Sequence, residues 1–243
     1  TLPSQFGERV VLRLLDRGQT QLGIAHLGLS ERDHAAFNQI ITAPEGLVLV
    51  TGPTGSGKTT SLYAALHALN DRQRPIEYSM DGVGQIQVNA KTEMTFARGL
   101  RAILRQDPDV IMVGEIRDGE TARIAVESAM TGHLVLSTLH TNTAIGAVSR
   151  LIDMGVERFL LAPMIRGLIA QRLVRKLCPD CRKPHAVSPS EADLLSGAVE
   201  EGAQVFAPDG CDACAGTGYR GRLPIYEIIA MTPKLETMIH EGA

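Results

Sequence analysis

The sequence predicts an α/β fold, a sheet of parallel strands connected by helices, and three observations support this class. A short run rich in β-branched residues at 46–51 passes through a glycine-rich loop into a helical pattern. Two more apolar runs, at 109–114 and 133–138, each end in a group of polar residues. The four cysteines lie in two pairs after these runs, which indicates a separate small subdomain.

The 243 residues are long enough for one large domain with appendages and a real core. We expect residues 1–29 to be the tail of a preceding N-terminal domain plus a linker, because 1–16 has strand-like apolar content but no start signal. Residues 30–175 are predicted to form the core, 176–222 the cysteine subdomain and 223–243 a short helical C-terminal segment.

The composition excludes some classes of protein. A net charge of −3 offers no basic field of the kind that attracts nucleic acid, so no nucleic-acid partner is expected. A hydrophobic fraction of 44% and a mean hydropathy of +0.03 are typical of a soluble globular protein. The sequence has neither a run of about 18 apolar residues that could span a bilayer nor a signal-peptide pattern. We therefore expect a cytoplasmic protein, which can still reach a membrane through a partner.

The glycine-rich loop, GPTGSGKT at 52–59, matches the phosphate-loop pattern G-x-x-x-x-G-K-[ST] at every fixed position. Its backbone N–H groups can converge on a phosphate at the N-terminus of the following helix, where an anion is favoured. Lys58 is expected to reach the β- and γ-phosphates of ATP, and the Thr59 hydroxyl to coordinate Mg²⁺. The expected nucleotide-binding residues are Gly52, Pro53, Thr54, Gly55, Ser56, Gly57, Lys58, Thr59 and Thr60.

Polar side chains follow the two other apolar runs. Glu115 follows the run at 109–114 and is expected to support Mg²⁺ or to orient water, on a strand next to that of the phosphate loop. Its alternative role is that of a solvent-exposed acid at the start of a helix. His140 follows the run at 133–138 and, with Thr138 and Asn142, is a candidate to sense the γ-phosphate; a histidine that caps a loop is the alternative.

Three arginines, Arg98, Arg101 and Arg105, recur at helical spacing and share one helix face. Such a cationic stripe is usually a solvated face. In an enzyme that handles phosphates it can instead supply positive charge at a subunit boundary.

The cysteine pairs have the spacing of a metal site, with Cys178 and Cys181 in one pair and Cys211 and Cys214 in the other. Two such pairs can provide four thiolates for a tetrahedral structural zinc site, with no position left open for water. Disulfides and free thiols remain as alternatives, and a redox centre usually has a single pair. The segment between the pairs has one short helical stretch and no evident core, so we expect the metal to stabilise it.

Three stretches and the two cysteine pairs together resemble the secretion ATPase superfamily, and within it the type II secretion ATPases of the GspE family. They are GPTGSGKTT at 52–60, DPDVIMVGEIRD at 107–118, TGHLVLSTLHTN at 131–142 and the two cysteine pairs. The resemblance extends from Gly46 to Arg222. Retraction ATPases of the pilus system usually lack the cysteine module, whereas type IV pilus extension ATPases remain an alternative.

The resemblance implies a RecA-like P-loop NTPase core that works as a homohexamer, with ATP and Mg²⁺ bound between an N-terminal domain and the core and with structural Zn²⁺. It implies that ATP hydrolysis powers pseudopilus assembly in type II secretion, and that a GspL-type partner holds the protein peripherally at the inner membrane. A regulatory nucleotide-binding module with negligible turnover is a rival reading, and the acidic balance disfavours a zinc-bearing helicase.

By the family's motifs, residues 52–59 correspond to Walker A, Glu115 to the Walker-B glutamate and His140 to the histidine box. The implied catalytic residues are Lys58, Glu115, His140 and Arg117. Further arginines match family arginines that face the nucleotide or the neighbouring subunit: Arg9 and Arg13 in the preceding domain, and Arg101 and Arg105 in the core.

One departure from the family pattern precedes Glu115. The family has a strand ending in an acidic box, T-V-E-D-P-I-E-Y, whereas here Arg74 is followed at once by PIEY at 75–78. We expect that about seven residues, a typical strand length, are absent between Arg74 and Pro75, which a Cα separation far above about 3.8 Å would show. Glu77 is the surviving acid of this box and is not assigned as the general base.

Overall fold

The computed structural model describes residues 2–4, 7–9, 23–70, 86, 94–195 and 198–242. At the N-terminus, β1 (Leu2–Ser4) and β2 (Gly7–Arg9) form an antiparallel pair. The junction between Arg74 and Pro75, Glu77 and Arg13 lie outside the described residues.

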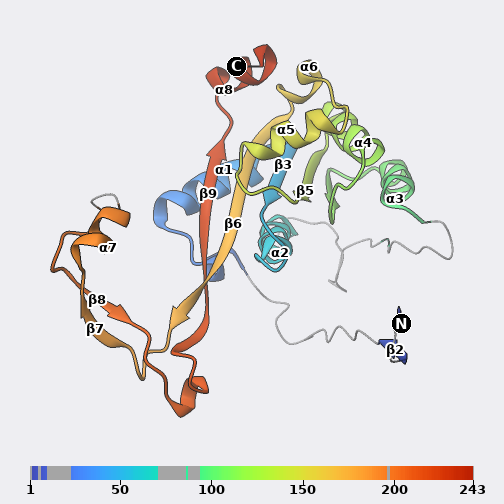
Figure 1. Cartoon of the computed structure of the whole chain (residues 1–243). Coiled ribbons are helices and arrows are strands. Elements are labelled where there is room, and N and C mark those ends of the chain that lie inside the picture. Colours follow the sequence, from blue (N-terminus) through green and yellow to red (C-terminus); the bar gives the residue numbers. More distant parts are fainter. Residues whose placement is uncertain are drawn as a thin grey trace.

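A five-stranded sheet in the order β4-β5-β3-β6-β9 forms the centre of the molecule (Figure 1). Four of its strands run parallel and β9 runs antiparallel to β6, which confirms the predicted α/β class. The strands are β3 (Gly46–Thr51), β4 (Val110–Val113), β5 (Leu134–Leu139), β6 (Ile165–Leu177) and β9 (Tyr219–Ala230).

The strands β3 and β5 are buried along their whole length, as their continuous apolar sequences favour for central strands of a parallel sheet. Their register pairs Thr51 with Leu139, so that Gly52 and His140 follow at the same edge. The strand β4 pairs with β5 and not with β3. The expectation that the Glu115 strand is next to the phosphate-loop strand is therefore wrong, because β5 lies between them.

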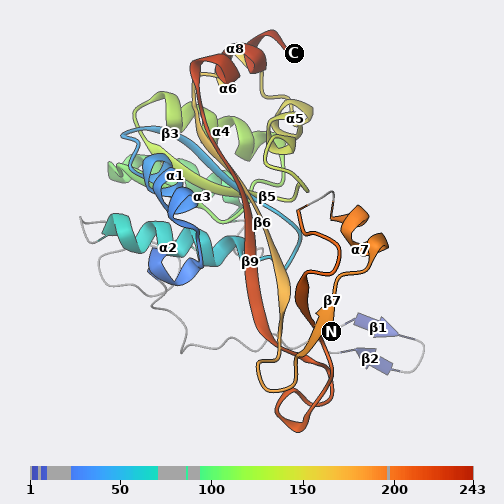
Figure 2. The same ribbon diagram turned by 90° about the vertical axis from the view of Figure 1, so that its left-hand side faces the viewer.

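Helices cover both faces of the sheet (Figure 2). On one face α1 (Glu31–Ile41) and α2 (Lys58–Asn70) pack with a short 3₁₀ turn, η2 (Ile24–Leu27), through a core that includes Phe37, Leu62 and Ile169. On the other face lie α3 (Phe96–Ile103), α4 (Gly119–Met130), α5 (Gly146–Asp153) and α6 (Arg158–Leu161). None of the described helices combines the length and the apolar character that crossing a bilayer requires.

A long antiparallel ribbon made by β6 and β9 extends beyond the sheet and leads to the cysteine lobe (Figure 1). We use this name for residues 178–218, which contain β7 (Lys183–Ala186), α7 (Pro189–Leu194), β8 (Gln204–Ala207) and η5 (Asp212–Cys214). The predicted helical stretch is α7, whereas the antiparallel pairing of β7 with β8 was not anticipated. The lobe is thus an insertion between two adjacent strands of the main sheet.

The short C-terminal helix is confirmed as α8 (Pro233–Glu241), with Thr232 as its N-cap. The predicted helical segment 223–243 begins too early, because residues 223–230 belong to β9. Pro224 does not end this strand. It lies opposite Leu173 in β9, an edge strand, where a residue without an N–H group is tolerated.

Candidate nucleotide site and cysteine cluster

The phosphate loop connects β3 to α2 at the carboxyl edge of the sheet, as the sequence predicts. Gly52 and Gly57 have left-handed backbone conformations, with φ of 140° and 90°. A Cβ atom at Gly52 would lie 2.3 Å from the carbonyl oxygen of Gln171, and one at Gly57 would lie 2.7 Å from the Nε2 atom of the same residue. Both positions therefore require glycine, for conformation and for space.

Lys58 lies inside the curve of this loop and is 7% exposed. Its Nζ atom donates to the carbonyl oxygens of Gly52 at 2.7 Å and Pro53 at 3.0 Å. Burial lowers the pKa of Lys58, and the charge of Glu115 opposes this shift. The charge of Glu115 therefore offsets only part of the cost of burying the ammonium group, and an anion in the loop would stabilise the charged form further.

Ser56, in the same loop, provides an independent sign that a polar ligand fits. Its Oγ is the buried side-chain polar atom that lacks a hydrogen-bond partner in the described part of the chain. A hydroxyl group can both donate and accept, and leaving it buried without a partner is costly. Together with the glycines and Lys58, it fits the loop to a phosphate group.

Glu115 and His140 meet at the same edge, from loops that follow β4 and β5. The Nε2 atom of His140 is 3.3 Å from Oε2 of Glu115, and Arg117 forms an ion pair with the same carboxylate. The hydrogen bond from Arg117, and secondarily the proximity of His140, lowers the pKa of Glu115 despite its burial. Glu115 is thus held as a carboxylate and is 19% exposed.

The structure does not show Glu115 as an exposed acid that starts a helix, or His140 as a loop cap. The N-cap of α4 is Asp118, whose Oδ1 accepts the N–H of Thr121 at 2.8 Å, so Glu115 lies before the helix. The ring of His140 points to Glu115 instead of capping a loop.

Thr138 and Asn142, whose role as γ-phosphate sensors stays a prediction, form hydrogen bonds within the chain. The hydroxyl of Thr138 donates to the carbonyl oxygen of Gly114 at 2.7 Å, and that of Ser137 donates to Val113 at 2.9 Å. These bonds fix the loop that carries Glu115 against β5, a role that the sequence did not reveal. Asn142 accepts a hydrogen bond from Arg172 through its backbone oxygen at 3.4 Å.

The predicted arginines do not all join this edge. Arg117 does, through Glu115, whereas Arg101 forms an ion pair with Glu120 of α4 at 2.7 Å. Arg105 lies exposed in the 3₁₀ turn η4 (Leu104–Gln106), and Arg98 is also exposed, as a solvated helix face predicts. Arg9 is the last residue of β2, and its side chain is outside the described part of the structure.

The four cysteines form one cluster in the lobe. All four Sγ atoms lie within 4.8 Å of one another, and none is in a disulfide. Cys178 and Cys211 are 3.9 Å apart, and Cys214 is 3.8 Å from both Cys181 and Cys211. A tetrahedron of sulfurs around zinc, with Zn–S bonds of about 2.3 Å, has edges of about 3.8 Å. The cluster is compatible with zinc.

Backbone N–H groups support one of the four sulfurs, that of Cys214. The N–H groups of Cys211 and Gly218 each donate to Sγ of Cys214 at 3.2 Å. The hydrogen bond from Cys211, followed by that from Gly218, lowers the pKa of Cys214 to about 6 although burial opposes it. Among the described residues of the lobe only Cys178, Val187, Cys214 and Gly218 are buried, so little hydrophobic core stabilises it.

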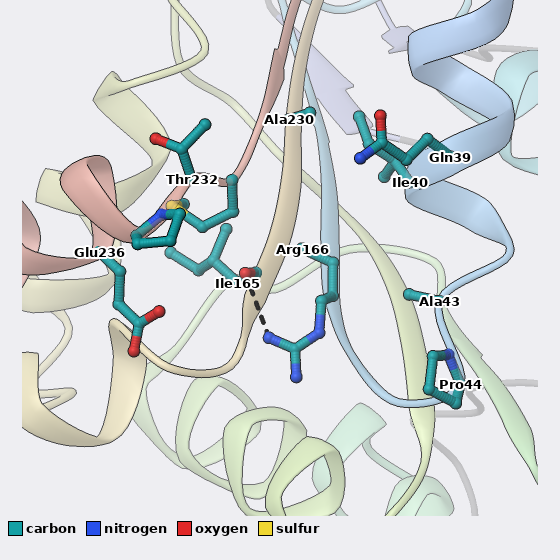
Figure 3. Close-up of a pocket in the computed structure, with 11 residues that line it drawn as sticks. Gln39, Ile40, Ala43, Pro44, Ile165, Arg166, Ala230, Thr232 and Glu236 are labelled. Atoms are coloured by element: carbon teal, nitrogen blue, oxygen red, sulfur yellow. Dashed lines mark hydrogen bonds between the residues drawn. The ribbon is translucent and has the colours of Figure 1, made fainter.

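A pocket of about 310 Å³ lies at the opposite edge of the sheet, between α1, the first residues of β6 and the start of α8 (Figure 3). Its Arg166 donates to the carbonyl oxygen of Pro163 at 2.6 Å. Since β3 and β6 are parallel, this amino-terminal edge is separated from the phosphate loop by the length of β3. The pocket is not part of the nucleotide site.

Comparison with known proteins gives consistent results. The family model described as "Type II/IV secretion system protein" matches residues 1–243. "Type II secretion system protein E" of Pectobacterium carotovorum is 56% identical over 100% of this chain and 50% of its own length. The protein of that name from Pseudomonas aeruginosa is 57% identical over 99% of this chain and 49% of its own. "Type II secretion system ATPase E" of Vibrio cholerae is 53% identical over 100% and 50%.

Solved structures with the same fold are secretion and pilus ATPases. The pilus retraction motor PilT with bound ADP has a TM-score of 0.65 at 31% identity, over 91% of this chain and 56% of that chain. The ATPase DotB of Legionella pneumophila has a TM-score of 0.64 at 25% identity, over 91% and 54%. The predicted P-loop ATPase fold is confirmed by this likeness.

The chain spans about half the length of the curated relatives it matches. The alignment with the Pectobacterium protein extends over 249 positions, six more than the 243 residues of the chain. The phosphate loop, the Glu115–His140 edge and the cysteine cluster all lie within the matched region. The chain belongs to the type II/IV secretion system protein family.

Proposed function

We propose that this chain is the ATP-hydrolysing core of a type II secretion motor, which works as a ring of six copies and drives pseudopilus assembly. The observation that carries the proposal is the convergence of Lys58, Glu115 and His140 at one sheet edge, beside a loop with an unpartnered buried hydroxyl. The printed names of the relatives support the assignment to secretion.

The residues act by positioning and by neutralising charge. The N–H groups of the loop and Lys58 bind the phosphates of ATP. The Thr59 hydroxyl, which is exposed at the start of α2, would coordinate Mg²⁺. The Glu115 carboxylate supports the Mg²⁺ shell or orients the attacking water, and His140 beside it responds to the γ-phosphate.

The general base belongs to the acidic box that the family carries. We propose that the residues of this box preceding PIEY at 75–78 are absent from the sequence and present in the natural protein. The alignment with the Pectobacterium relative supports this, because it is six positions longer than the chain. The mass of the natural protein's peptide around Arg74 tests it, and a mass equal to the printed sequence would contradict it.

The motor also depends on contacts with a preceding domain, with neighbouring copies and with a membrane partner. Arg9, Arg101 and Arg105 are assigned to the nucleotide at a domain or subunit boundary, and Arg101 would leave Glu120 to reach it. A GspL-type partner of the full-length protein holds the motor at the cytoplasmic side of the inner membrane. A type IV pilus extension motor has the same chemistry and differs in the assembled filament.

Turnover in a ring distinguishes a motor from a regulatory nucleotide-binding module. With the acidic box restored, we expect phosphate release from ATP to be slow for the isolated chain and to rise when the chain is fused to a hexameric scaffold, because neighbouring copies supply arginines. The matched control is the same chain on a monomeric carrier. A hexamer that binds ATP without turnover, with the acidic box restored, would favour the regulatory module and contradict the motor.

We also propose that the cysteine cluster binds one structural Zn²⁺. The near-tetrahedral sulfur spacings and the small buried core of the lobe support this assignment. In small domains of this kind, metal binding supplies folding free energy on the order of 10 kcal/mol.

Removal of zinc by a chelator, or the substitution Cys178→Ser, is expected to unfold the cysteine lobe and leave the ATPase core folded. Limited trypsin digestion should then cut rapidly after Arg182, while ADP affinity remains close to that of the untreated protein. Ser190→Ala, an exposed serine in α7, is the matched control and should leave the digestion pattern unchanged. Equal protease resistance with and without the metal would contradict the structural role.

A further inference from the structure

Gln171, in β6, contacts both ends of the phosphate loop. It is 3% exposed. Its backbone oxygen occupies the space beside Gly52, and its amide nitrogen the space beside Gly57, as the distances of 2.3 and 2.7 Å to the absent Cβ atoms show. The first and the last glycine of the loop, Gly52 and Gly57, thus both pack against one residue of the neighbouring strand β6.

The Gln171 side chain is also bonded to the helix that follows the loop. The hydroxyl of Ser61 donates to Oε1 of Gln171 at 2.7 Å, and both groups are buried. Ser61 is in the first turn of α2, where its N–H donates to the carbonyl oxygen of Gly57 at 3.1 Å. The bond from Ser61 to Gln171 therefore fixes the N-terminal turn of α2, whose N–H groups are available to phosphates.

A second hydrogen bond, from the edge strand β9, lies beside Gln171. Gln171 lies directly opposite Tyr226 in the pairing of β6 with β9. The phenol of Tyr226 donates to the carbonyl oxygen of Leu27 at 2.9 Å. Burial raises the pKa of Tyr226, so its phenol stays protonated and keeps this bond.

We propose that Gln171 is a positioning residue of the nucleotide site, which holds the phosphate loop and the first turn of α2 in the shape that binds phosphates. This inference rests on the proposed function, because the bound group is the phosphate chain of a nucleotide. Gln171 acts through the loop backbone and Ser61, so its effect falls on the phosphates and not on the nucleoside.

The alternative role for Gln171 is purely structural, that of a buried glutamine that stabilises the core. Loss of such a residue lowers the melting temperature but changes the affinity for ADP and for adenosine alike. A positioning residue gives a different signature, since a displaced loop weakens the binding of phosphates and leaves adenosine binding unchanged.

The test uses the whole zinc-loaded chain and calorimetric titration with ADP and with adenosine. Gln171→Leu is expected to weaken ADP binding about tenfold, because a buried hydroxyl loses its partner, with adenosine binding unchanged. Ser61→Ala should weaken ADP binding to a similar extent. Ser61→Thr, which keeps the hydroxyl, should retain most of the wild-type affinity for ADP. The double variant should be no weaker than the weaker single variant, since the two substitutions break one bond.

Gln204→Leu, at an exposed glutamine in β8, is the matched control and should bind ADP as the wild type does. If Gln171→Leu does not fold, Ser61→Ala and Ser61→Thr decide the question. ADP affinity within twofold of wild type in a folded Gln171→Leu or Ser61→Ala variant overturns the positioning role. Wild-type protein that binds no ADP, or that binds it equally after Lys58→Ala, overturns the proposed function instead.

Discussion

Lys58→Ala is expected to abolish ATP hydrolysis by the hexameric form with the acidic box restored, with a loss of about 10²- to 10³-fold or more in kcat. The ammonium of Lys58 is buried in the loop, where its charge interacts strongly with a phosphate because little solvent screens it. Alanine removes this charge and leaves the carbonyl oxygens of Gly52 and Pro53 without their donor. Phosphate release from ATP, measured with a coupled assay, gives the turnover rate.

Lys176→Ala is the matched control for this loss, because Lys176 is an exposed lysine in β6. It should retain the wild-type rate. Circular dichroism should show the same helix content for both variants. Turnover by Lys58→Ala at the rate of the control would overturn the assignment of the loop as the ATP site.

Glu115→Gln is expected to reduce kcat about 10²-fold or more while ADP binds as tightly as before, or more tightly. Replacing the carboxylate by an amide removes a negative charge near the phosphates, which favours ADP binding. It also removes the group that supports Mg²⁺ or orients water. The lowered pKa of Glu115 means that the carboxylate is the form present at neutral pH. Single-turnover hydrolysis and calorimetric titration separate the effect on chemistry from that on binding.

For this variant the control is Glu127→Gln, an exposed glutamate on α4 that forms only a long ion pair with Arg123 at 4.0 Å. It should change neither quantity. If Glu115→Gln weakened ADP binding and left single-turnover hydrolysis unchanged, Glu115 would be a binding residue and not part of the hydrolytic machinery.

The features that the sequence predicted best are those set by local spacing. The phosphate loop follows from a buried strand, a fixed glycine pattern and a helix within about 25 residues, which is a local arrangement. The cysteine cluster follows in the same way, because each pair brings two thiolates to one turn and only the pairing of the two turns depends on the fold.

What the sequence did not predict depends on contacts between distant residues. The insertion of β5 between β3 and β4 is a matter of strand order, which the apolar runs do not encode. Residues 223–230, which we expected to be helical, belong to β9 because they pair with the neighbouring strand β6. The bond between Ser61 and Gln171 joins residues 110 positions apart, and its only sequence signal is a glutamine within an apolar run.

Arg101 illustrates a different limit. Its helical spacing with Arg98 and Arg105 correctly indicated a solvent-facing stripe, but Glu120, its ion-pair partner, comes from another helix. An arginine that is to act on a neighbouring copy can be identified only when that copy is present.

The central claim is that the loop at 52–59 binds the phosphate chain of a nucleotide through its backbone, Lys58 and Mg²⁺. Calorimetric titration of the wild-type chain with ATP, ADP and adenosine, each with and without Mg²⁺, tests it most directly. We expect ATP and ADP to bind much more tightly than adenosine, and Mg²⁺ to strengthen ATP binding. Adenosine that binds as tightly as ADP, with no effect of Mg²⁺, would contradict the claim.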